Sequence, residues 1–141
     1  MKAILKQVEG CFFAGKADSN HWTAVDTSEE TCGFNAATHP MELLLISLGS
    51  CVGSDIAYIL KKKRLKYDRF EINMDADRAK SHPKVFTHVH MEYVLYGKDL
   101  NPLHVEQAIS LSKEKYCPVQ AMLKNAVSIT TSYKIINDDN K

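Results

Sequence analysis

The sequence predicts an α+β fold, and three observations support this class. Strand-like and helix-like segments are segregated along the chain instead of alternating, which favours α+β over a parallel α/β sheet. Residues 39–64 read as one long apolar helix, and residues 69–77 and 85–95 alternate apolar and polar side chains as half-buried strands do. We therefore expect antiparallel sheets around a long central helix, in a single domain over residues 1–141.

The region before the central helix reads as a meander of three short strands. Residues 2–8, 11–17 and 22–26 have strand-like composition, and turns separate them, the first at Gly10. Residues 26–38 are polar and end in small side chains, so we expect a loop that leads into the helix.

The ends of the central helix carry the usual signals. Pro40 suits the first helical position, where its missing N–H costs nothing, and Thr38 or His39 would be the cap. Glu42 lies in the first turn and the basic run 61–64 in the last, as the helix dipole favours. The first half of the helix is apolar on nearly every side, so we expect it to be buried all round.

Two glycines and a cysteine occupy the middle of this helix. Gly49 and Gly53 each cost about 1 kcal/mol relative to alanine, which predicts that another backbone element passes close by. Cys51 lies between them, so we expect its thiol at that close approach. Beyond Ser54 the helix is polar, and its apolar part is expected to be too short to span a bilayer.

The two alternating segments predict an antiparallel hairpin with one wet face, joined by a turn over residues 79–84. His88 and His90 share the wet face. Two histidines with no obvious third ligand are more often surface residues than a zinc site, so we expect no metal there. The expected apolar face consists of Phe70, Ile72, Met74, Ala76, Val85, Val89, Met91, Tyr93 and Leu95.

The last part of the chain predicts two helices and a strand. A residue before proline avoids the helical region, so the Cys117-Pro118 step separates the two helices. The expected elements are a helix that begins at Asn101-Pro102 and runs to about Lys115, a short helix over 118–125, a strand over 127–135 and a frayed polar tail over 137–141.

Composition excludes several classes of protein. A formal net charge of +1 gives no reason to expect nucleic acid or an anionic membrane as a partner. Residues 1–7 do not look like a signal peptide, and four cysteines without one point to a reducing, cytoplasmic location. No C-x-x-C, H-E-x-x-H or nucleotide-binding glycine motif occurs, so we expect no metal site and no nucleotide site.

The thiols remain as candidates for chemistry. Cys51 lies in mid-helix, and Cys117 lies at a helix N-terminus, where the dipole and free N–H groups favour thiolate. Cys11 and Cys32 fall in a strand and a loop and read as ordinary cysteines that take no part with them. A cysteine in a buried apolar helix is usually a small hydrophobic residue. From spacing alone, Cys51 and Cys117 can be either a reactive thiol pair or ordinary structural cysteines, and the reactive pair is the less common of the two.

Two motifs carry a family resemblance. The segments PMELLL at 40–45 and LGSC at 48–51, followed by YCPV at 116–119, resemble the OsmC/Ohr family of osmotically inducible and organic hydroperoxide resistance proteins. The resemblance implies an α+β fold in which two chains intertwine as a homodimer around their central helices. It also implies a thiol peroxidase that acts on small organic hydroperoxides, is reduced by an external dithiol and holds no metal or bound organic cofactor.

The resemblance also implies roles for three residues. Cys51 would be the attacking thiolate, Cys117 the resolving thiol, and Glu42 the glutamate that supports the site. The family pairs this glutamate with an arginine from the N-terminal region, but no arginine precedes Arg64 in this chain. Lysines and histidines do occur there, at Lys6, Lys16, His21 and His39, but a lysine lacks the planar fork that binds a carboxylate in two places.

The sequence leaves three hypotheses about function. The leading one is a peroxidase, and apolar side chains at Leu48, Val52 and Met122 would suit a fatty or aromatic peroxide. The alternative is a dimeric protein that binds hydrophobic ligands or senses redox state, with slow turnover or none. The third is a structural dimer with inert thiols.

The helix geometry adds an expectation about assembly. On an unbroken helix Glu42 and Cys51 lie on opposite sides and about 13 Å apart along the axis. They can then share a site only between chains, so we expect two central helices to cross antiparallel near Gly49 and Gly53 in a symmetric homodimer.

Overall fold

The computed structural model describes residues 1–137, so residues 138–141 of the predicted tail lie outside the described residues. The chain divides into two compact units, Met1–Ile46 and Ser47–Lys141, and each unit is considered by itself. The prediction that residues 1–141 form a single domain stays a prediction.

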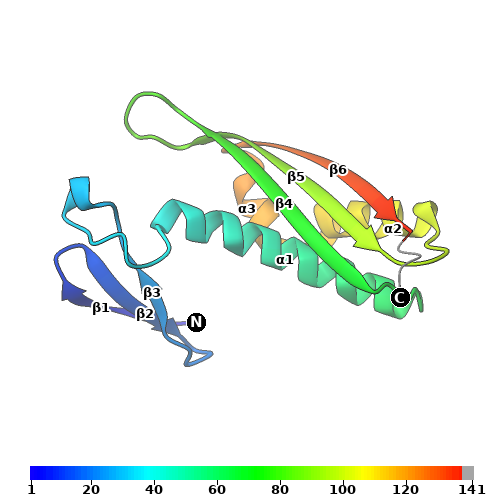
Figure 1. Ribbon diagram of the computed structural model, residues 1–141, viewed down its shortest axis with the longest axis horizontal. Coiled ribbons are helices and arrows are strands. Elements are labelled where there is room, and N and C mark those ends of the chain that lie inside the picture. The colour runs from blue at the N-terminus through cyan, green and yellow to red at the C-terminus, as the bar shows by residue number, and fades with distance from the viewer. Residues whose placement is uncertain (138–141) are drawn as a thin grey trace. The chain divides into compact units, whose positions relative to one another are not determined.

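The element order confirms the predicted α+β class, with the first three strands, the long helix and the hairpin at the expected places (Figure 1). The elements are β1 (Ala3–Glu9), β2 (Phe12–Ala17), β3 (Thr23–Val25), the 3₁₀ turn η1 (Glu29–Thr31), α1 (Pro40–Lys62), β4 (Arg69–Arg78), β5 (Phe86–Tyr96), α2 (Pro102–Leu111), the π-helical turn η2 (Ser112–Tyr116), α3 (Pro118–Leu123) and β6 (Ser128–Ile136).

The first unit is an antiparallel meander in the order β1-β2-β3, followed by a loop that a buried carboxylate organises. Asp26 is fully buried, and its carboxylate accepts hydrogen bonds from the backbone N–H groups of Thr27, Phe34 and Ala36 at 2.8, 3.0 and 3.0 Å. Burial opposes its charge, but these donors outweigh burial and hold the pKa of the Asp26 carboxyl below its usual range. The loop over residues 26–38 is therefore ordered by one side chain.

The second unit contains the sheet β4-β5-β6, and one of its pairings differs from the prediction. β4 and β5 form the predicted antiparallel hairpin, but β5 and β6 pair in parallel, whereas we expected antiparallel sheets. Parallel neighbours need a crossover connection, and α2, η2 and α3 supply it.

The core of the second unit lies between α1 and the inner face of the sheet. The alternation predicted for β5 is confirmed for Val89, Met91, Tyr93 and Leu95, which are buried. It fails at Val85, which precedes the strand and is 50% exposed, and at Val94, which is buried on the opposite face. The side chains that are least exposed in this core belong to Leu48, Val52, Ile56, Leu60, Val89, Met91, Tyr93, Leu95 and Val105.

The glycines of α1 face β4. A Cβ atom on Gly49 would lie 2.7 Å from the sulfur of Met74, and one on Gly53 would lie 2.9 Å from Cδ1 of Ile72. The close neighbour is therefore the chain's own sheet, so the glycines do not mark the expected crossing of two central helices; that crossing itself stays a prediction. The glycines let the long side chains of β4 approach the helix axis.

We expected the first half of α1 to be buried all round, and this expectation is wrong for the single chain. Leu43, Leu44 and Leu45 are half-buried, and Ile46 is 54% exposed. α1 is also long and apolar enough to cross a membrane by length and composition, contrary to our expectation from sequence, although the core helix of a soluble protein passes the same test.

Candidate active site

Two sulfur atoms and a carboxylate converge in the second unit. The ligand atoms of Cys51, Asp55 and Cys117 all lie within 4.8 Å of one another. Cys51 and Asp55 are one turn apart on α1 and so share a helix face. Cys117 comes from the start of α3, so the structure brings together two of the three residues that the sequence singled out.

Local sequence explains the position of Cys117. Pro118 requires an extended residue before it, and Cys117 has φ −72° and ψ 103°. Cys117 therefore caps α3, and its Sγ accepts a hydrogen bond from the backbone N–H of Gln120 at 3.3 Å. Its own N–H donates to the carbonyl of Ser112 across η2 at 2.9 Å. Cys117 is thus held by hydrogen bonds to residues before and after it in the chain.

Burial controls the protonation of Cys117. Burial raises the pKa of the Cys117 thiol to about 11, and the hydrogen bond from Gln120 opposes this only in part. A hydrogen bond with the Cys51 thiol, and the charges of Cys51 and Asp55, raise it further. Cys117 is 3% exposed and keeps its proton at neutral pH. Our expectation that the helix start favours a thiolate here is wrong, because desolvation outweighs the donor N–H.

Asp55 and Ser112 are site residues that the sequence reasoning missed. The buried hydroxyl of Ser112 donates a hydrogen bond to Oδ2 of Asp55 at 3.1 Å, which joins η2 to α1. The spacing of four residues between Cys51 and Asp55 was a usable signal, since it places both on one helix face. The position of Ser112 became clear only with the fold, because it depends on the irregular turn before Cys117.

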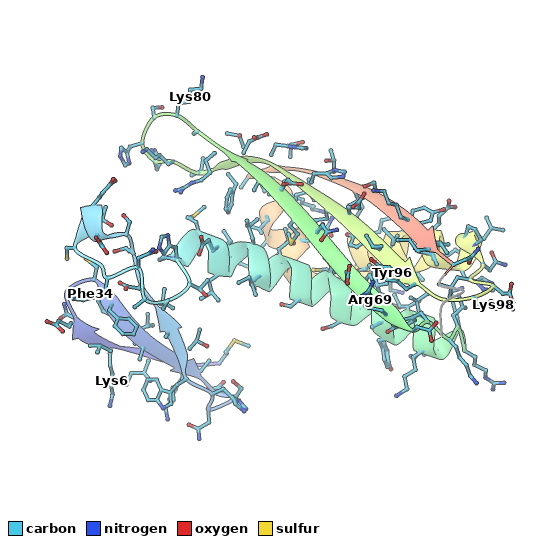
Figure 2. The ribbon with its side chains drawn as sticks, viewed as in Figure 1. Lys6, Phe34, Arg69, Lys80, Tyr96 and Lys98 are labelled. Atoms are coloured by element: carbon cyan, nitrogen blue, oxygen red, sulfur yellow. The ribbon has the colours of Figure 1, made fainter. Side chains whose placement is uncertain are left out.

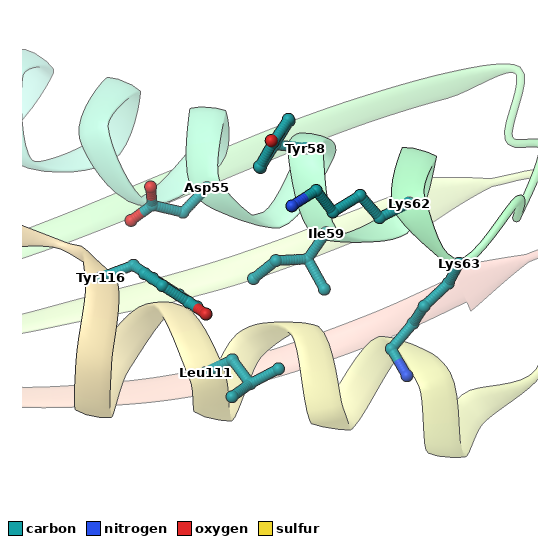
Figure 3. A pocket seen from close by; sticks show the side chains of 7 residues that line it. All are labelled: Asp55, Tyr58, Ile59, Lys62, Lys63, Leu111 and Tyr116. Carbon is teal, nitrogen blue, oxygen red and sulfur yellow. The ribbon is translucent and has the colours of Figure 1, made fainter.

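A cavity of about 380 Å³ adjoins the cluster at Asp55 (Figure 3). Figure 3 shows Asp55 at one end and Lys63 at the other. Lys63 Nζ donates to Oε1 of Gln107 at 2.6 Å, while Lys62 Nζ lies 4.5 Å from the ring centre of Tyr58. The lining residues are Asp55, Tyr58, Ile59, Lys62, Lys63, Leu111 and Tyr116.

The apolar residues predicted to surround the thiols lie elsewhere. Leu48 and Val52 are each 1% exposed and pack in the core, so they do not line an open pocket. Met122 is 81% exposed. The prediction failed for Leu48 and Val52 because neighbours of Cys51 along α1 point to different faces of the helix, and for Met122 because its side chain on α3 is exposed. Apolar walls do adjoin the site, but they come from Ile59, Leu111 and the tyrosine rings.

Glu42 and the arginines make other contacts. Oε2 of Glu42 accepts a hydrogen bond from the backbone N–H of His39 at 2.9 Å, so it caps the first turn of α1. Arg69 pairs with Glu71 at 3.2 Å and stacks over Tyr96 (Figure 2). Glu42 therefore serves the start of its own helix, and Arg69 contacts neighbours on its own sheet.

The cluster permits two kinds of chemistry. The sulfur atoms of Cys51 and Cys117 lie within 4.8 Å of each other, so a disulfide forms if they approach to an S–S distance of about 2.05 Å. Two thiolates and a carboxylate are also a donor set that suits Zn²⁺. Disulfide formation and Zn²⁺ binding both consume the reduced thiols, so the pair could do only one of them at a time.

Comparisons with known proteins agree with the fold. A family model described as OsmC-like protein matches residues 33–132. The curated protein YhfA of Escherichia coli strain K12 is 36% identical over 136 residues, which cover 96% of this chain and 98% of YhfA.

Solved structures give the same result. A hypothetical protein from Aquifex aeolicus VF5 is 33% identical, with a TM-score of 0.86 and coverage of 98% of this chain and 97% of that one. An organic hydroperoxide resistance protein from Elizabethkingia anophelis has a TM-score of 0.70, 14% identity and coverage of 96% and 94%. At that identity the likeness shows the fold alone.

Proposed function

This chain belongs to the family of OsmC-like proteins, and from that premise we propose that it is a thiol peroxidase that reduces organic hydroperoxides. One observation carries the proposal: the sulfur atoms of Cys51 and Cys117 and a carboxylate oxygen of Asp55 lie within 4.8 Å of one another, and Asp55 lines a cavity with apolar walls. The family supports a redox-related role, and this geometry supplies two thiols that can exchange electrons with a peroxide.

The proposed reaction has two steps. The Cys51 thiolate attacks the outer oxygen of the hydroperoxide, the O–O bond breaks, and the alkoxide leaves and takes a proton to become an alcohol. Cys51 is then a sulfenic acid. The Cys117 thiol loses its proton and attacks the Cys51 sulfur, the S–S bond forms, and water leaves. Two thiols have then supplied the two electrons that reduce the peroxide.

Burial sets the protonation of Cys117 in this proposal. Its raised pKa keeps the proton on the thiol at neutral pH, so Cys117 must lose that proton before it attacks Cys51. The nearby carboxylate of Asp55 helps to keep the proton on Cys117.

The cavity suggests the class of substrate. Its walls of Ile59, Leu111 and two tyrosine rings suit a fatty or aromatic chain better than hydrogen peroxide. Lys62 and Lys63 place ammonium groups along it, which would attract a substrate that also carries a carboxylate, such as a fatty acid hydroperoxide.

We further propose a cytoplasmic homodimer that an external dithiol reduces, without a bound cofactor. The first unit exposes large apolar side chains to water, and a second copy of the chain that packed on them would bury this surface. Leu5 and Val8 of β1 are 63% and 58% exposed, and Trp22 is 51% exposed. A partner chain remains the way for Glu42 to support Cys51, although the crossing would not lie at the glycines.

The test is a stopped-flow measurement of Cys51 oxidation. Cumene hydroperoxide should oxidise the wild-type thiol faster than hydrogen peroxide does, and dithiol-dependent turnover should follow. Cys51→Ser should abolish the reaction, while Cys32→Ser serves as the matched thiol control. Comparable rates with hydrogen peroxide, or full activity of Cys51→Ser, would refute the proposal.

The second candidate is a redox-sensing or hydrophobic-ligand-binding protein, and the absence of an arginine before Arg64 favours it. It predicts that Cys51 is oxidised once without sustained turnover, or that the purified protein retains an apolar ligand. Steady-state assays with a dithiol separate the two, because only a peroxidase consumes hydroperoxide in excess over protein.

A further inference from the structure

A second pair of cysteines meets in the first unit. Cys11 lies in the turn before β2, and Cys32 follows η1 in the loop of residues 26–38. The backbone N–H of Cys11 donates to the carbonyl of Cys32 at 3.0 Å, and the Cys11 side chain is close enough to raise the pKa of the Cys32 thiol. Their spacing along the chain gave no indication of this contact, and we expected two ordinary cysteines.

The backbone around the pair is built for this close approach. Gly10 has φ +53°, a conformation that suits glycine, and a Cβ there would lie 2.6 Å from the carbonyl oxygen of Cys32. Any other residue at position 10 would push the loop off the turn. On the far side, the buried carboxylate of Asp26 holds the loop in place through Phe34. The cysteines are therefore adjacent because two independent features fix their backbones.

The two thiols differ in access. Cys32 is exposed and Cys11 is half-buried, so a reagent in solution reaches Cys32 first. The hydrogen bond from Cys11, followed by desolvation, raises the pKa of the Cys32 thiol above its usual value. The Cys32 thiol therefore holds its proton more firmly than an ordinary thiol, and it is the member of the pair that a reagent in solution reaches.

We propose that Cys11 and Cys32 form a second redox site, which takes small disulfides of the glutathione class and closes to an intramolecular disulfide. The Cys32 thiolate attacks one sulfur of the small disulfide, forms a mixed disulfide and releases one small thiol. The Cys11 thiolate then attacks the Cys32 sulfur, and the second small thiol leaves. Two protein thiols are oxidised, and one small disulfide is reduced to two thiols.

This site goes beyond the proposed peroxidase function and needs neither Cys51 nor Cys117. Its disulfide would tie the β1–β2 turn to the loop that leads into α1, and so restrict that loop. The chain would then respond to two oxidants separately: hydroperoxides at the buried pair, and small disulfides at the surface pair.

The test uses oxidised glutathione with the full-length protein, followed by acid quench and peptide mapping without reduction. In the wild type and in Cys51→Ser, the Cys11–Cys32 disulfide should exceed the Cys32–glutathione mixed disulfide by about tenfold or more, because the second step is intramolecular. In Cys11→Ser the mixed disulfide at Cys32 should accumulate instead. Cys117→Ser serves as the matched control for a variant that removes a thiol elsewhere.

Two results would overturn the inference. One is a persistent mixed disulfide at Cys32 in the wild type, and the other is a disulfide between Cys32 and Cys51 or Cys117. Oxidation of Cys51 by cumene hydroperoxide is also measured in Cys32→Ser, the thiol control of the peroxidase test, and should stay within about twofold of wild type. Loss of the peroxide reaction in the wild type with a normal Cys11–Cys32 disulfide would therefore refute the peroxidase proposal alone.

Discussion

The step that resolves the sulfenic acid should depend steeply on pH, because Cys117 must lose a proton that its site retains. Its pKa is raised from 9.0 to about 11, so at any pH below 9 about a hundredfold less thiolate is present than for an unperturbed thiol. At pH 7 the thiolate is about one part in ten thousand. The rate of disulfide formation should therefore rise about tenfold per pH unit between pH 7 and 9.

The assay separates this step from the first one. One equivalent of cumene hydroperoxide oxidises Cys51, dimedone competes for the sulfenic acid, and mass spectrometry after acid quench gives the ratio of adduct to disulfide at each pH. The adduct should dominate near pH 7 and give way to the Cys51–Cys117 disulfide as the pH rises. A ratio that is flat from pH 6.5 to 8.5 would show that Cys117 is already a thiolate and would refute the reasoning.

A pair of variants tests the cause of the raised pKa. Asp55→Asn removes a negative charge that raises the pKa of Cys117, so the profile should move to lower pH, by less than the total shift because burial contributes most. Ser112→Ala removes the hydrogen bond to Asp55 but leaves the charge, and it should leave the profile nearly unchanged. If Asp55→Asn slows disulfide formation at every pH, Asp55 is instead the base that takes the Cys117 proton.

Three further predictions concern stability and the cavity, each with a urea or kinetic readout. Gly33→Ala should destabilise the first unit by about 2 kcal/mol or more, because a Cβ would overlap the backbone carbonyl of Thr27. Gly15→Ala should cost less, because its Cβ would meet Cγ of Leu5 at 3.3 Å, a tight contact that a side chain can relieve; equal midpoints in urea would contradict this. Asn101→Ala should cost about 1 kcal/mol, since its side chain caps α2, and an unchanged unfolding free energy would count against the cap. Leu111→Ser should slow oxidation of Cys51 by cumene hydroperoxide several-fold more than oxidation by hydrogen peroxide, while Leu103→Ser, exposed on the same helix, should do neither.

Local signals predicted most of the fold. Pro40 and the capping carboxylate of Glu42 fixed the start of α1, and alternation fixed the β4–β5 hairpin, because each depends on residues close in sequence. The parallel direction of β6 could not be read from its own alternation, since a strand shows the same period in either direction. It follows from the crossover through α2, η2 and α3.

The candidate site was predictable only in part. The family resemblance singled out Cys51 and Cys117, but no sequence pattern gives the balance between burial and the N–H of Gln120 that decides the protonation of Cys117. Nor does spacing show that Cys11 meets Cys32, because this contact depends on a loop that the Asp26 carboxylate closes. Long-range contacts of this kind appear only when the whole unit is folded.

The crossover that makes β6 parallel has a consequence during synthesis of the chain. Cys117 lies on that crossover and leaves the ribosome 66 residues after Cys51. At translation rates of about 5 to 20 residues per second this interval is roughly 3 to 13 s. Cys51 spends it without its thiol partner, covered at most by the β4–β5 hairpin, and β6 can add to the sheet only later still. The nascent chain is therefore more vulnerable than the finished protein to irreversible oxidation at Cys51. Oxidative stress during translation should mark newly made molecules first.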